Sequence, residues 1–138
     1  MVAESAGAYE VLIVDDDAAF RETLRAVFEP YFILMEAECG EEALELLGGH
    51  RFHLALFDMH MRELTGLDVI RHLRSTLITL PCILITASLT DEIQKEAEQV
   101  ETYSVLRKPV ARQELITTVA VALQETYQDP DLPQRLGM

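Results

Sequence analysis

The stretch HLALFDMHMRELTG, residues 53–66, decides the fold of this chain. Four apolar residues, Leu54 to Phe57, end abruptly at the acid Asp58, and a polar loop follows as far as Gly66. An apolar run of this length, flanked by helical patterns, is typical of a strand that is buried on both faces. We therefore expect Asp58 at the carboxyl end of a central parallel strand, where open α/β sheets bind their ligands.

Short apolar runs alternate with helical patterns along the rest of the chain. The expected strands are residues 11–14, 32–37, 54–58, 82–86 and 104–106, and the last helix spans residues 112–127. Strict alternation of strands and helices predicts a parallel sheet with helices on both faces and right-handed crossovers. The expected architecture is a flavodoxin-like (βα)5 α/β fold. It is a three-layer sandwich whose doubly wound parallel sheet has the strand order 2-1-3-4-5.

Polar residues mark where two of the helices begin. Asp17 is expected to cap the helix after the first strand, and Thr90 the helix after the fourth. Apolar residues at helical spacing should face the core in the helix that follows Gly66. These core-facing residues are Leu67, Ile70, Leu73 and Leu77.

The 138 residues suit one domain with a core of its own. Residues 1–9 are small and polar and are expected to form a disordered N-terminal tail. The domain is expected over residues 10–127. Residues 128–138 contain two prolines and are expected to be a C-terminal tail or the start of a linker.

Composition limits the classes of function. The formal net charge of −13 argues against direct binding to nucleic acid, which requires clustered Lys and Arg. Cys39 and Cys82 lack a metal-binding spacing and favour a reducing cytosol with free thiols. The sequence has neither the roughly 20 apolar residues of a membrane span nor a signal-peptide pattern, so we expect a cytoplasmic protein without membrane contact.

Chemically useful side chains follow the carboxyl ends of the expected central strands. Asp15 and Asp16 follow the first strand, Asp58 the third, Thr86 ends the fourth, and Lys108 follows the fifth. The expected strand order brings all of them to one end of the sheet. Carboxylates that lie together repel unless a cation neutralises them, and hard oxygen ligands suit Mg²⁺. A nucleophilic carboxylate, a hydroxyl and an ammonium group then fit phosphoryl transfer to Asp58.

Four motifs in order, VDDD, LFDMHM…TG, LITAS and RKPV, resemble those of the receiver domain of two-component response regulators. The resemblance covers about residues 10–127. It implies that Asp58 accepts a phosphoryl group from a phosphohistidine of a sensor histidine kinase or phosphotransfer protein. It implies a signalling domain rather than an enzyme. Such a domain assists only its own phosphorylation and dephosphorylation, and it switches an output domain or partner.

The resemblance also implies roles for individual residues. Thr86 would move toward the phosphoryl group, and Lys108 would contact it, positioned by a cis peptide before Pro109. In the family, the face built from the last two helices and the last strand contacts partners or a second copy of the chain. The implied Mg²⁺ ligands are Asp15, Asp16, Asp58 and the backbone carbonyl of His60.

The chain departs from the family pattern in two places, which motivate an alternative function. Arg62 stands where the family usually has proline, and Val105 where it has an aromatic residue that turns inward on activation. Tyr103 lies nearby at a different offset. The alternative is a pseudo-receiver, an interaction module of the same fold that works without phosphorylation.

An enzyme with a similar fold or site is a third candidate class of function. Dehalogenase-type phosphatases place a second acid two residues after the nucleophilic aspartate, where this chain has His60. Flavodoxins have a phosphate-binding loop after the first strand, where this chain has three acids instead. Both patterns disfavour an enzyme.

Overall fold

Five parallel strands form one sheet in the order β2-β1-β3-β4-β5. A computed structural model describes residues 8–137 of the chain, and the predicted fold class and strand order are confirmed. The strands lie close to their predicted positions. They are β1 (Glu10–Val14), β2 (Ile33–Ala37), β3 (Leu54–Asp58), β4 (Cys82–Thr86) and β5 (Ser104–Arg107).

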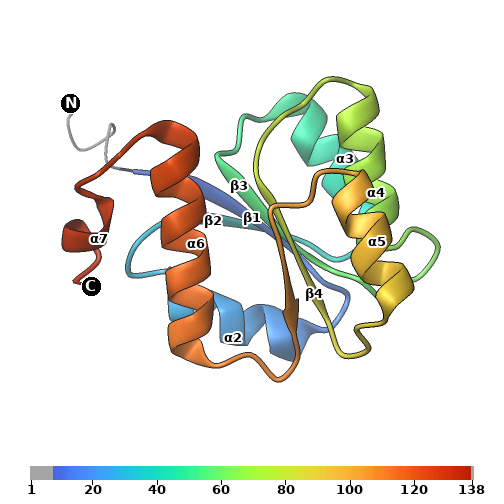
Figure 1. Cartoon of the computed structure of the whole chain (residues 1–138), viewed down its shortest axis with the longest axis horizontal. Coiled ribbons are helices and arrows are strands. Elements are labelled where there is room, and N and C mark those ends of the chain that lie inside the picture. Colours follow the sequence, from blue (N-terminus) through green and yellow to red (C-terminus); the bar gives the residue numbers. More distant parts are fainter. Residues whose placement is uncertain (1–7, 138) are drawn as a thin grey trace.

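Helices cover both faces of the sheet, giving three layers (Figure 1). The helices α2 and α6 pack on one face, and α3, α4 and α5 pack on the other. The helices are α2 (Ala18–Phe28), α3 (Gly40–Gly49), α4 (Gly66–Ser75), α5 (Asp91–Gln99), α6 (Arg112–Tyr127) and a short α7 (Leu132–Arg135).

The central strands are apolar along nearly their whole length because they supply both cores. Successive side chains of a strand point to opposite faces of the sheet. Along β1, Val11 and Ile13 therefore enter the core under α2 and α6, while Leu12 and Val14 enter the core under α3 and α4. The strands β3 and β4 are buried throughout, so the burial that was expected for residues 54–58 is confirmed.

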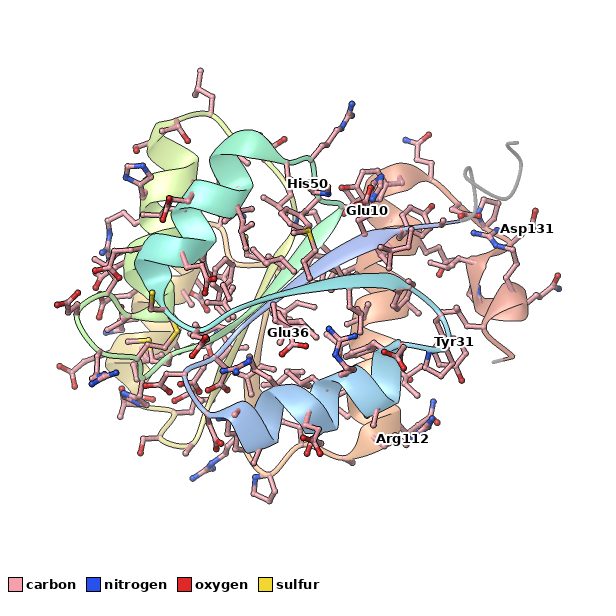
Figure 2. All side chains as sticks on the ribbon, turned by 180° about the vertical axis from the view of Figure 1, so that it is seen from behind. Glu10, Tyr31, Glu36, His50, Arg112 and Asp131 are labelled. Carbon is pink, nitrogen blue, oxygen red and sulfur yellow. The ribbon has the colours of Figure 1, made fainter. Side chains whose placement is uncertain are left out.

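Polar contacts attach α2 to the edge of the sheet. Glu36 points from β2 toward α2 (Figure 2), where its two oxygens bind Arg21 at 3.0 Å and Arg25 at 2.6 Å. The side chain of Asp17 caps α2 by accepting from the N–H of Ala19, as predicted. The ion pairs of Glu36 therefore join α2 to β2. The predicted cap of α5 by Thr90 is also confirmed.

The prediction for Leu77 is wrong. The helix α4 ends at Ser75, and Leu77 has a left-handed φ of 65° with 85% of its surface exposed. Arg74 explains the early end, because its guanidinium donates to the carbonyls of Ile78 and Leu80 and turns the chain back toward β4.

Residues 128–137, expected to form a tail or linker, contain ordered structure. Leu132 and Leu136 are buried in the same core as Tyr9. The Tyr9 hydroxyl donates to Asp129 at 2.7 Å, and Arg135 binds both oxygens of Asp129. The two ends of the described chain therefore pack together; residues 1–7 of the expected N-terminal tail lie outside the described residues.

Low pH should weaken the contact between the two ends of the described chain, because it protonates Asp129. The hydrogen bonds from Arg135 lower the pKa of Asp129 from 3.8 to about 2. Because the folded pKa is the lower one, the carboxylate stabilises the fold above about pH 4, and the effect fades as the pH falls toward 2. Asp129→Asn should therefore unfold at a lower temperature than wild type at neutral pH, with the difference shrinking below about pH 4.

Thermal unfolding followed by circular dichroism across this pH range tests the expectation. Asp131→Asn is the matched control, because the exposed side chain of Asp131 does not cap α7. A difference between Asp129→Asn and wild type that stays constant with pH would contradict the assignment.

Candidate functional site

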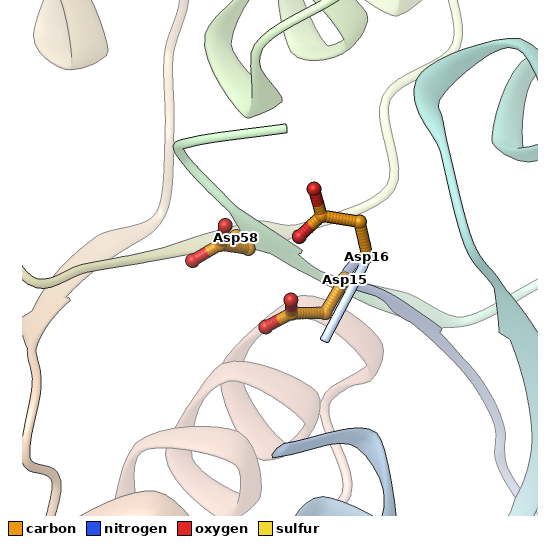
Figure 3. A group of neighbouring side chains, drawn as sticks. All are labelled: Asp15, Asp16 and Asp58. Atoms are coloured by element: carbon orange, nitrogen blue, oxygen red, sulfur yellow. The ribbon is translucent and has the colours of Figure 1, made fainter. Parts of the chain in front are cut away.

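Three acids meet at the carboxyl ends of β1 and β3, which are neighbours in the sheet. Asp15 and Asp16 directly follow β1, and Asp58 is the last residue of β3. One carboxylate oxygen from each acid lies within 4.8 Å of the others (Figure 3). The structure therefore brings together the three carboxylates that the sequence predicts there.

Burial and the nearby acid charge disfavour the ionised form of Asp15. Asp15 and Asp58 are buried, at 1% and 7% exposure, whereas Asp16 is exposed. Burial raises the pKa of Asp15, and the charge of Asp58 adds to this, against the lowering effect of the hydrogen bond from the N–H of Asp17. Neighbouring positive charge therefore favours the ionised form of Asp15.

Lys108 supplies one positive charge. Its ammonium nitrogen lies 2.9 Å from Asp58 Oδ1 and 3.4 Å from Asp15 Oδ2. Burial lowers the pKa of Lys108, but the hydrogen bond to Asp58 and the charge of Asp15 outweigh burial and raise it. The peptide between Lys108 and Pro109 is cis, as the family resemblance implied.

Thr86 and His60 occupy different environments. Thr86 ends β4 next to β3 and is fully buried, with its hydroxyl accepting from the N–H of Ser88 at 3.1 Å. His60 lies exposed in the loop after Asp58. The roles of the Thr86 hydroxyl and the His60 carbonyl stay predictions.

The loop after β3 closes without the proline usual in the family. The N–H of Met59 donates to Ile85 and the N–H of Gly66 to Met59, which fixes both ends of the loop. Arg62 is exposed, and Glu63 takes the left-handed conformation at φ 68°. The turn is therefore made one residue after Arg62.

Val105 and Tyr103 have separate surroundings on β5. Val105 pairs with Leu84 and is half-buried against the core under α4 and α5. Tyr103 is 37% exposed, and its hydroxyl donates to Glu125 of α6 at 2.6 Å. Tyr103, two residues before the expected switch position, is therefore held by a hydrogen bond to α6.

Three residues that shape the site were not predicted as site residues. The centroid of the Phe20 ring lies 4.1 Å from the Lys108 ammonium nitrogen, and Arg21 donates to the backbone carbonyl of Asp15 at 2.7 Å. Gly66 packs so closely that an added Cβ would lie 2.5 Å from the carbonyl oxygen of Asp58. The sequence signal for Gly66 was its place directly after the cap Thr65, where α4 begins beside β3.

Fold and site together define the class of flavodoxin-like receiver domains, with an acidic cluster at the switch point of a doubly wound sheet. The family model for the response regulator receiver domain matches residues 11–120. The chain therefore belongs to the receiver domain family of response regulators, and it is a signalling domain of a two-component system.

Relatives of known name agree with this assignment. Response regulator MprA of Mycobacterium sp. (strain KMS) is 37% identical over 129 residues, covering 89% of this chain and 55% of the relative. The MprA of Mycobacterium leprae (strain TN) is 37% identical over 123 residues, covering 86% of this chain and 53% of the relative. The chain thus spans about half the length of the curated relatives it matches.

Solved structures show the same fold. The receiver domain of Francisella response regulator 1452 has a TM-score of 0.81 at 28% identity, covering 86% of this chain and 98% of that one. A CheY-like receiver domain protein from Methanospirillum hungatei has a TM-score of 0.84 at 22% identity, covering 88% of this chain and 98% of that one. Among residues 8–137, no helix combines the length and apolar character that crossing a membrane requires.

Proposed function

We propose that Asp58 accepts a phosphoryl group from a phosphohistidine of a sensor histidine kinase or phosphotransfer protein, in a Mg²⁺-dependent reaction. The observation that carries the proposal is the position of the Asp58 carboxylate, which lies within 4.8 Å of the acids that follow β1 and 2.9 Å from the ammonium nitrogen of Lys108. A nucleophile, a metal-binding acid pair and a cation are the parts that phosphoryl transfer to a carboxylate requires.

The transfer is one displacement at phosphorus. A carboxylate oxygen of Asp58 attacks the phosphorus atom, the bond from phosphorus to the histidine nitrogen breaks, and the imidazole leaves with the electron pair. The ammonium of Lys108, already within 2.9 Å of Asp58, contacts a phosphoryl oxygen and offsets its charge. The hydroxyl of Thr86 donates to another phosphoryl oxygen.

The acid cluster fits Mg²⁺. Carboxylate oxygens within 4.8 Å of one another suit a small, hard cation that takes few protein ligands and keeps several waters. The exposed side of the cluster at Asp16 leaves room for those waters and for the phosphoryl group. When bound, Mg²⁺ supplies positive charge to the phosphoryl oxygens and relieves the repulsion between Asp15 and Asp58.

Intact-mass spectrometry of the wild type tests the proposal. With phosphoramidate as donor, the protein should gain one phosphoryl group when Mg²⁺ is present and none when Mg²⁺ is chelated. A protein that remains unlabelled with donor and Mg²⁺, although it is folded, would contradict the proposed function.

Asp16→Asn should weaken Mg²⁺ binding by about tenfold or more, because one full charge leaves the acid cluster. Asp17→Asn is the matched control, since it removes a neighbouring charge while asparagine still caps α2. Titration of each variant with Mg²⁺ by calorimetry measures the difference. Equal Mg²⁺ affinities of the two variants would mean that Asp16 is not a Mg²⁺ ligand.

The alternative, an interaction module that works without phosphorylation, gains no support from the comparisons, but Val105 in the switch position motivates its test. The partner is expected on the face formed by α5, β5 and α6, or as a second copy of the chain. Partner binding that is unchanged by phosphorylation of the wild type would favour the alternative. Because the formal net charge is −13, we still expect that this domain itself does not bind nucleic acid.

A further inference from the structure

Lys108 contacts two kinds of group. Its ammonium nitrogen forms ion pairs with the carboxylates of Asp58 and Asp15, and it lies over the face of the Phe20 ring, 4.1 Å from the ring centroid. We propose that Phe20 is a positioning residue that keeps the Lys108 ammonium directed at Asp58 for phosphoryl transfer. This inference rests on the proposed function of Asp58.

The Phe20 ring is itself fixed. Phe20 lies in the first turn of α2, where Asp17 caps the helix and the next residue, Arg21, donates to the backbone carbonyl of Asp15. The ring is partly buried and packs against the core under α2 and α6. A ring held in this way has a defined position relative to the acids that follow β1.

The contact with the Phe20 ring limits the conformations that the Lys108 side chain can adopt. Its four-carbon side chain is flexible and 22% exposed, and its two ion pairs hold only the charged end of the side chain. An ammonium within about 6 Å of an aromatic ring is attracted to the negative face of the ring. The ring keeps its place during the reaction, whereas the anionic partner of Lys108 changes from the Asp58 carboxylate to a phosphoryl oxygen. The ring therefore continues to hold the ammonium group while its anionic partner changes.

Two substitutions of Phe20 distinguish the effect of the cation–π contact from the effect of apolar packing. Phe20→Leu keeps an apolar side chain and removes the ring, whereas Phe20→Tyr keeps the ring. We expect phosphorylation by phosphoramidate, at saturating Mg²⁺, to slow about two- to fivefold in Phe20→Leu and to remain close to the wild-type rate in Phe20→Tyr.

A double-mutant cycle with Lys108→Met tests whether Phe20 acts through Lys108. In that background no ammonium is left to position, so adding Phe20→Leu should leave the residual rate unchanged. A loss of the same factor in both backgrounds, or no loss in either, would overturn the proposal. These outcomes do not affect the proposed function, which is tested separately by the labelling of the wild type and of Asp58→Asn.

A second measurement does not depend on phosphorylation. The ε-methylene protons of Lys108 lie near the Phe20 ring, so their NMR signals should show an upfield ring-current shift in wild type and Phe20→Tyr. The shift should disappear in Phe20→Leu. Identical Lys108 signals in wild type and Phe20→Leu, in folded proteins, would overturn the contact and the proposal with it.

Discussion

Replacing Asp58 with asparagine should abolish phosphorylation by phosphoramidate and Mg²⁺. The amide has nearly the shape of the carboxylate but lacks its negative charge, so it removes the nucleophile without adding bulk to β3. Asp58 is 7% exposed and ends a strand that is buried throughout, so this near-isosteric change avoids disturbing the packing. Intact-mass spectrometry should show no added phosphoryl group on Asp58→Asn under conditions that label the wild type.

The same substitution should leave the fold in place because two electrostatic effects oppose each other. Lys108 loses its 2.9 Å ion pair with Asp58 but keeps its contact with Asp15. At the same time, Asp15 is relieved of the Asp58 charge that raises its pKa. Asp17→Asn, which removes a charge just beyond the site, should still be labelled. Full labelling of Asp58→Asn would assign the phosphoacceptor to another residue.

Strand positions and the acid cluster could be predicted because both depend on local patterns. The run Leu54 to Phe57 is apolar without interruption, and only a strand that supplies two cores needs such a run. Once the strand order is known, Asp15 and Asp58 must meet, because the carboxyl ends of the neighbouring strands β1 and β3 lie together. Lys108 follows β5, which is separated from β3 by β4, and its long side chain brings the ammonium group to both acids.

Contacts between distant elements could not be predicted in the same way. Leu77 fits a helical period, but Arg74 ends the helix by binding carbonyls from the following loop, and periodicity carries no information about such bonds. The burial of Leu132 depends on its packing in a core shared with Tyr9, although the two lie at opposite ends of the chain. Phe20 likewise meets Lys108 only because the first turn of α2 lies beside the residue that follows β5.

Gly66→Ala should lower stability by about 3 kcal/mol, the upper part of the range for overpacking a dense site. The added Cβ would lie 2.5 Å from the carbonyl oxygen of Asp58 and 2.7 Å from Leu84 Cδ1. The Leu84 side chain can move, but the Asp58 carbonyl belongs to the backbone of β3 and cannot retreat without moving the strand end. Chemical denaturation of wild type and variant measures the difference in the free energy of unfolding.

Gly48→Ala is the matched control, because an alanine Cβ at that position in α3 meets no atom within 4 Å. Alanine in a helix is favoured over glycine by roughly 0.5–1 kcal/mol, so the control should be slightly more stable than the wild type. The two variants add the same methyl group, but the expected changes in the free energy of unfolding have opposite signs. The Gly66→Ala strain falls on the backbone of the proposed phosphoacceptor, so labelling of Asp58 should also slow. A Gly66→Ala protein as stable as Gly48→Ala would mean that α4 can shift away from β3, and that the end of β3 is not rigidly held.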